Sequence, residues 1–125
     1  MTESKRLRIF VVDDEYVIAF TLAAILKRSG LSALAFTNPH EALESARAQP
    51  PDMVISDVVM PNMTGIELGI EMRTLYPHCK VLLYSGQAAT ADLLSQAKQS
   101  GHEFELLSKP VHPKDLLAAI RSLQQ

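Results

Sequence analysis

Five short apolar segments alternate with longer amphipathic segments along this chain, and that alternation constrains its fold more than any other feature. The first segment, Arg8 to Val12, is continuous and β-branched, as is typical of a strand buried on both faces. The expected strands are residues 8–12, 31–36, 53–57, 81–85 and 104–108. Strict alternation of strands and helices predicts an α/β fold, in which a parallel sheet carries helices on both faces through right-handed crossovers.

The ends of the amphipathic segments carry the usual helix signals. Gly30 follows the first apolar helical repeat as a C-terminal stop. Asn38 is a suitable N-cap, and Pro39 suits the first position of the helix after it. The expected helices cover residues 15–29, 39–49, about 65–76, 91–100 and 113–123.

The length of 125 residues fits one domain, and no linker or low-complexity tract interrupts it. We therefore expect a single domain over residues 1–125, without an output domain. Whether the chain is a single-domain protein or part of a longer one stays open at this point. No apolar run is long enough to cross a bilayer, and no secretory signal is visible.

Composition narrows the classes of partner. A formal net charge of −2 argues against nucleic acid as the main partner. The single cysteine, Cys79, cannot form an internal disulfide and is expected to be a structural thiol, which suits a reducing compartment. We expect a cytoplasmic protein without membrane insertion.

Polar side chains follow four of the expected strands where each strand ends. The first strand is followed by Asp13 and Asp14, the third ends in Asp57, the fourth in Ser85, and the fifth is followed by Lys109. Because ligands of open α/β sheets bind beyond the carboxyl ends of the strands, these groups should meet at one edge. Each group alone is as typical of a turn or helix cap as of a ligand. Their coincidence at four strand ends indicates a site.

Carboxylates gathered at one edge need a cation, because like charges a few ångströms apart repel by about 1 kcal/mol per pair in water. Mg²⁺ prefers hard oxygen ligands and usually binds one or two carboxylates. Asp14 and Asp57 are the candidates for direct ligands, and Asp13 for a ligand that acts through water. The backbone carbonyl of Val59 is the candidate that completes the set.

Asp57 is also the candidate nucleophile, because a carboxylate can attack phosphorus and form an aspartyl phosphate. It lies on the expected central strand, between the acidic pair and the side that carries Ser85 and Lys109. Lys109 would offer a positive charge to the phosphoryl group, Ser85 a hydrogen bond, and the backbone near Gly86 further N–H donors.

The peptide bond between Lys109 and Pro110 has a further use. An X–Pro bond tolerates the cis form far better than other peptide bonds do. We predict that this bond is cis, which would turn the chain sharply and direct the lysine side chain into the site.

These motifs together resemble the receiver domains of two-component response regulators, across essentially the whole chain. The resemblance rests on residues 11–15 (VVDDE), 57–65 (DVVMPNMTG), Ser85-Gly86 and Lys109-Pro110. It implies a flavodoxin-like, doubly wound, five-stranded parallel sheet in the order 2-1-3-4-5, with five helices and three layers.

The resemblance also implies a function. A histidine kinase or histidine phosphotransfer protein would phosphorylate Asp57 in a Mg²⁺-dependent reaction, and the phosphoryl group would switch partner interactions. The chain would be a phosphoacceptor and not an enzyme, which leaves open whether it catalyses its own phosphorylation and dephosphorylation. A monomer or a phosphorylation-dependent dimer is expected. The cognate kinase and the downstream partner do not follow from the sequence.

One position departs from the family pattern. Receivers usually carry Tyr or Phe three residues before the lysine, as a switch side chain, whereas this chain has Leu106. A receiver-like interaction module that works without phosphorylation is therefore the alternative function. A small-ligand protein on the same fold, such as a flavin carrier, ranks behind both because the site is acidic.

Overall fold

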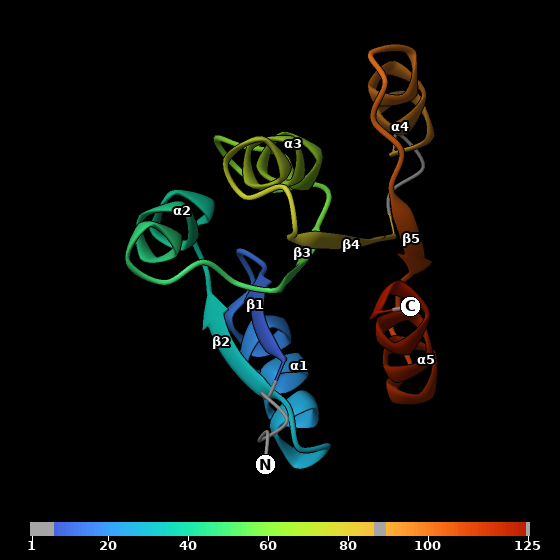
Figure 1. Cartoon of the computed structure of the whole chain (residues 1–125). Coiled ribbons are helices and arrows are strands. Elements are labelled where there is room, and N and C mark those ends of the chain that lie inside the picture. The colour runs from blue at the N-terminus through green and yellow to red at the C-terminus, as the bar shows by residue number, and fades with distance from the viewer. Residues whose placement is uncertain (1–6, 87–89, 125) are drawn as a thin grey trace.

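The computed structural model describes residues 7–86 and 90–124, and the chain forms one five-stranded parallel sheet flanked by helices (Figure 1). The strand order is β2-β1-β3-β4-β5, which confirms the doubly wound, flavodoxin-like order predicted from the sequence. The elements are β1 (Arg8–Val12), α1 (Tyr16–Arg28), β2 (Ser32–Phe36), α2 (Pro39–Ala48), β3 (Met53–Asp57), α3 (Gly65–Leu75), β4 (Lys80–Ser85), α4 (Thr90–Gln99), β5 (Glu105–Ser108) and α5 (Pro113–Gln124).

The sheet separates two groups of helices. In Figure 1, α1 and α5 cover one face, and α2, α3 and α4 cover the other. The first face packs the α1 and α5 side chains Leu22, Leu26, Leu116 and Ile120 against the sheet. The second face packs α2 and α3 through Ala42, Ala46, Leu68 and Met72, and α4 through Ala97. The central strands β1 and β3 are therefore buried on both sides, as their unbroken apolar sequences predict.

Strand ends differ from the sequence expectation by one residue at three places. β2 begins at Ser32 because Leu31 still belongs to the end of α1: its N–H donates to the carbonyl of Leu26 at 3.1 Å. Gly30 makes this closure possible, with a φ of 86° that favours glycine. β4 begins at Lys80, and β5 begins at Glu105.

Hydrogen bonds and a close backbone approach connect the start of α3 to the end of β3. Thr64 caps α3 and forms a reciprocal capping box with Glu67. The N–H of Gly65 donates to the carbonyl of Val58 at 2.8 Å. A Cβ at Gly65 would overlap the carbonyl oxygen of Asp57, so only glycine lets α3 approach the end of β3 this closely.

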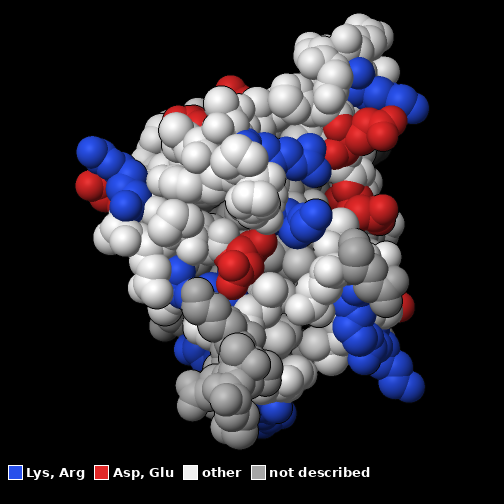
Figure 2. All heavy atoms as spheres, viewed as in Figure 1, with Lys and Arg blue, Asp and Glu red and all other residues white. Residues whose placement is uncertain are grey.

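Charged residues of both signs are interspersed on the face seen in Figure 2, and Lys and Arg form no continuous patch on its visible part. This distribution agrees with the small net charge of −2. None of the helices within residues 7–86 and 90–124 has both the length and the apolar character that crossing a bilayer requires.

Cys79 is expected to resist thiol reagents in the native protein. It is 4% exposed, and burial raises the pKa of its thiol from 9.0 to about 11, with Asp52 adding to the rise and Arg73 opposing it. The thiolate fraction at pH 8 should therefore fall by about a hundredfold relative to an unfolded chain, and native reactivity should grow only as the pH approaches 11. Labelling with a chromogenic disulfide at pH 8, with and without denaturant, measures this; equal rates would contradict it.

Candidate functional site

Side-chain alternation places three polar groups at the carboxyl end of one sheet face. Successive residues of a strand point to opposite faces, so Asp13 follows the direction of Val11, and Asp57 that of Ile55. Tyr84 belongs to the same buried cluster as Val11 and Ile55. All three groups therefore meet on the side that α1 and α5 cover.

The three aspartates that the sequence singled out come together. Asp13 is fully buried, Asp57 is 5% exposed, and Asp14 is exposed. Each offers a carboxylate oxygen, and these oxygens lie within 4.8 Å of one another. Three hard oxygen donors at this spacing, one of them open to solvent, fit a small divalent cation such as Mg²⁺.

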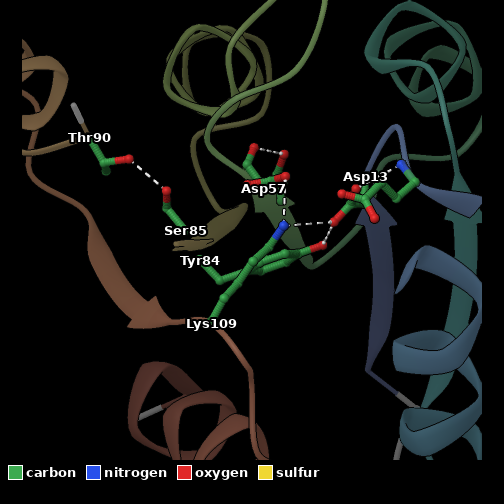
Figure 3. A network of polar contacts seen from close by, with 8 residues as sticks. Asp13, Asp57, Tyr84, Ser85, Thr90 and Lys109 are labelled. Atoms are coloured by element: carbon green, nitrogen blue, oxygen red, sulfur yellow. Dashed lines mark hydrogen bonds and ion pairs between the residues drawn. The ribbon is translucent and has the colours of Figure 1, made fainter. Parts of the chain in front are cut away.

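Lys109 lies between the two buried carboxylates (Figure 3). Its Nζ is 3.0 Å from Oδ2 of Asp57 and 3.8 Å from Oδ2 of Asp13. The peptide bond between Lys109 and Pro110 is cis, the form expected from the sequence. The backbone N–H of Lys109 donates to the carbonyl of Ser85 at 3.1 Å, which joins the ends of β4 and β5. Gly86 lies beside the lysine, because a Cβ there would stand 3.4 Å from the Lys109 Cβ.

The groups around Asp57 shift its pKa in opposite directions. Burial raises the pKa of Asp57 above 3.8, and the nearby charge of Asp13 adds to the rise, while the Lys109 hydrogen bond and a backbone hydrogen bond from Val59 oppose it. Burial alone would lower the pKa of Lys109, but the hydrogen bond and charge of Asp57 and the charge of Asp13 raise it overall. Lys109 therefore stays protonated beside the carboxylates.

Tyr84 is a site residue that the sequence reasoning missed. It is fully buried, and its hydroxyl donates to Oδ2 of Asp13 at 2.7 Å (Figure 3). Burial, followed by the charge of Asp13, raises the pKa of Tyr84, so the phenol keeps its proton and acts as a donor. Strand alternation could have identified Tyr84 from the sequence. Neighbouring residues of a strand point to opposite faces, so Tyr84 points away from the face of Ser85 and toward the face of Asp13 and Asp57.

Thr90 is a second residue that the sequence reasoning missed. Ser85 points to the other side of the sheet from Tyr84, and its Oγ shares a hydrogen bond of 2.6 Å with Oγ1 of Thr90 at the start of α4. Both side chains are buried. The expected start of this helix at residue 91 excluded Thr90, which is its first residue.

Leu106 occupies the slot where the family pattern has an aromatic ring. It lies on β5 opposite Leu83 of β4 and is 38% exposed. Together with Ser85 and Thr90 it lines a surface hollow of about 470 Å³ beside Lys109. Among the described residues that line this hollow, none carries an aromatic ring.

The fold and this site together define the class of protein. The profile of the response regulator receiver domain matches residues 9–121, and the chain belongs to this family.

Curated relatives agree with this assignment. The chain is 30% identical to the transcriptional regulatory protein CreB of Escherichia coli, over 95% of this chain and 51% of CreB. It is also 30% identical to the response regulator receiver protein CpdR of Brucella abortus, over 93% of this chain and 95% of CpdR. The chain thus spans about half of CreB and nearly all of CpdR.

Solved structures show the same fold. The signal receiver domain of an HD domain-containing protein from Pseudomonas fluorescens is 28% identical and superposes with a TM-score of 0.86, over 96% of this chain and 95% of that domain. The chemotaxis protein CheY4 of Vibrio cholerae is 26% identical with a TM-score of 0.84, over 95% of this chain and 99% of that chain.

Proposed function

We propose that this protein is the phosphoacceptor of a two-component phosphorelay, with Asp57 as the residue that receives the phosphoryl group. The observation that carries the proposal is the set of charges around Asp57. Its carboxylate lies 3.0 Å from the Lys109 ammonium and shares a cluster within 4.8 Å with Asp13 and Asp14. A nucleophilic carboxylate, a fixed cation and a cation-binding cluster at one sheet edge suit phosphoryl transfer.

In the proposed reaction, a carboxylate oxygen of Asp57 forms a bond to the phosphorus of a phosphohistidine on the donor protein. The P–N bond of the donor breaks, and the imidazole nitrogen keeps the electron pair and takes up a proton from water. The product is an aspartyl phosphate on this chain. Oδ2 of Asp57 accepts the Lys109 hydrogen bond, which places a positive charge beside the attacking carboxylate.

The neighbouring residues have separate roles in this proposal. Lys109 holds a positive charge against the transferred group, and the hydroxyl of Ser85 and the backbone near Gly86 offer hydrogen bonds to its oxygens. Asp14, Asp57 and the Val59 carbonyl are the proposed ligands of Mg²⁺, with Asp13 acting through water. Bound Mg²⁺ would neutralise the negative charge of the phosphoryl oxygens.

The partners follow from the same chemistry. The phosphoryl donor is a histidine kinase or a histidine phosphotransfer protein of the cytoplasm, and the phosphorylated receiver then binds a different partner or a second copy of itself. We propose that Ser85 couples the phosphoryl group to α4 through Thr90, since these two hydroxyls share a buried hydrogen bond. This route does not need an aromatic ring at Leu106.

The test is incubation of the protein with acetyl phosphate and MgCl₂, followed by intact-protein mass spectrometry. We expect the mass of one phosphoryl group to be added when Mg²⁺ is present and no addition when EDTA removes it. Hydroxylamine should remove the added group, because acyl phosphates are cleaved by this nucleophile. Absence of any addition with Mg²⁺ would contradict the proposal.

A further inference from the structure

Tyr84 makes a long reach across the sheet to the acidic cluster. It lies on β4, whereas its hydrogen-bond partner Asp13 follows β1, and β3 separates the two strands. In Figure 3 the Tyr84 ring passes beside the Lys109 side chain and its hydroxyl meets the Asp13 carboxylate. The Lys109 Nζ is 5.4 Å from the centre of the ring. The buried Tyr84 hydroxyl therefore connects β4 to the carboxylate that follows β1.

Asp13 is held through both of its oxygens. Oδ1 accepts the backbone N–H of Glu15 at 2.8 Å. Oδ2 accepts the Tyr84 hydroxyl at 2.7 Å and faces the Lys109 ammonium at 3.8 Å. Hydrogen bonds to an ionised carboxylate at such distances are among the stronger ones in proteins, and they fix its orientation.

The three carboxylates of the cluster are therefore not equivalent. Asp14 is exposed. Asp57 accepts the hydrogen bond of Lys109 on Oδ2 and a backbone hydrogen bond from Val59. Asp13 is bound by donors on both oxygens, one from its own turn and one from β4. Donors on both oxygens fix the orientation of the Asp13 carboxylate, and its remaining lone pairs can still accept hydrogen bonds from metal-bound water.

We propose that Tyr84 is a positioning residue that sets the metal-binding geometry of the cluster by holding Asp13. The phenol turns the Asp13 carboxylate toward β4 and Lys109, so that Asp14 and Asp57 supply the direct ligands and Asp13 orients bound water. This inference rests on the proposed Mg²⁺-dependent function. It also explains the position of Lys109: with Asp13 held by Tyr84, the ammonium is free to pair more closely with Asp57.

The test is the substitution Tyr84→Phe, which removes one hydroxyl and keeps the buried ring. Binding of Mg²⁺ alone is measured by isothermal titration calorimetry at constant pH and ionic strength. We expect the dissociation constant to rise by about tenfold, the lower end of the range found when outer-shell groups of a metal site are removed. Tyr76→Phe is the matched control, because Tyr76 follows α3 and packs in the other cluster, and it should bind Mg²⁺ as the wild type does.

A double-mutant cycle shows whether Tyr84 acts through Asp13. In an Asp13→Ala background, Tyr84→Phe should change Mg²⁺ affinity by less than about twofold, since the acceptor of the hydroxyl is already removed. An unchanged affinity for Tyr84→Phe in the wild-type background, or a full tenfold loss in both backgrounds, overturns the inference. Failure of the wild type to bind Mg²⁺ overturns the proposed function itself, so the two failures are distinguishable.

A measurement on the wild type keeps the inference testable if Tyr84→Phe does not fold. The hydroxyl proton of a buried, hydrogen-bonded tyrosine exchanges slowly enough to be followed by NMR at low temperature. We expect this resonance to shift on titration with MgCl₂ and to persist at saturation, because Asp13 keeps its bond to Tyr84. Loss of the resonance at saturation would show that Asp13 turns to the metal, and would overturn the inference.

Discussion

Replacing Asp57 by asparagine is expected to abolish phosphoryl uptake from acetyl phosphate, a loss of at least roughly a thousandfold. The amide is not a nucleophile toward phosphorus, and Asp57 is the carboxylate that Lys109 contacts most closely, at 3.0 Å. Uptake is measured by intact-protein mass spectrometry in MgCl₂. Labelling of the variant at the wild-type rate would mean that another residue accepts the phosphoryl group.

The Asp57→Asn variant should fold, so its loss of phosphoryl uptake comes from the missing nucleophile and not from unfolding. Because the pKa of Asp57 is raised above 3.8 by burial, the folded protein binds its proton more tightly than the unfolded chain does. The stability of the wild type therefore falls as the pH rises from 3.8 through the raised pKa, and asparagine removes this loss. Asp52→Asn is the matched control: Asp52 accepts the Arg8 N–H at the opposite end of β3, and its variant should keep full uptake.

The same variant separates the two functions that the sequence left open. A phosphoacceptor should lose phosphorylation-dependent partner binding with Asp57→Asn, whereas a phosphorylation-independent interaction module should keep it. The exposed Leu106 is the feature that makes this comparison necessary. Persistence of partner binding in the variant would favour the interaction module.

Gly65→Ala is expected to lower the free energy of unfolding by about 3 kcal/mol, at the upper end of the costs of overpacking. The new Cβ would overlap the carbonyl oxygen of Asp57 and lie 2.9 Å from its carbonyl carbon. Backbone atoms cannot move aside as a flexible side chain can. Urea unfolding, monitored by circular dichroism, measures the change.

Gly101→Ala is the control for Gly65→Ala. Gly101 has a φ of 89°, and a Cβ there would meet nothing within 4 Å. Its cost comes only from the left-handed backbone and should be about 1 kcal/mol. Gly65→Ala should also weaken Mg²⁺ binding because it displaces the end of β3, whereas Gly101→Ala should not. Equal costs for both variants would contradict the close approach of α3 to β3.

The fold could be predicted from the sequence because its signals are local. Continuous β-branched segments such as residues 8–12, and caps such as Asn38, act within a few residues of the chain. Right-handed crossovers then leave few arrangements of five alternating strands and helices. The one-residue difference at Leu31 arose because a helix end and a strand start compete for the same N–H.

The convergence of Asp13, Asp14, Asp57 and Lys109 was likewise determined by the sequence, since each follows or ends a strand whose carboxyl end must lie at one edge. The hydrogen bonds of Tyr84 to Asp13 and of Ser85 to Thr90 were decided only by the tertiary structure. Both depend on how far a side chain reaches across strands or to a helix, and that distance depends on packing. The sequence alone therefore determined which groups form the site, and the tertiary structure decided which of their oxygens are already occupied.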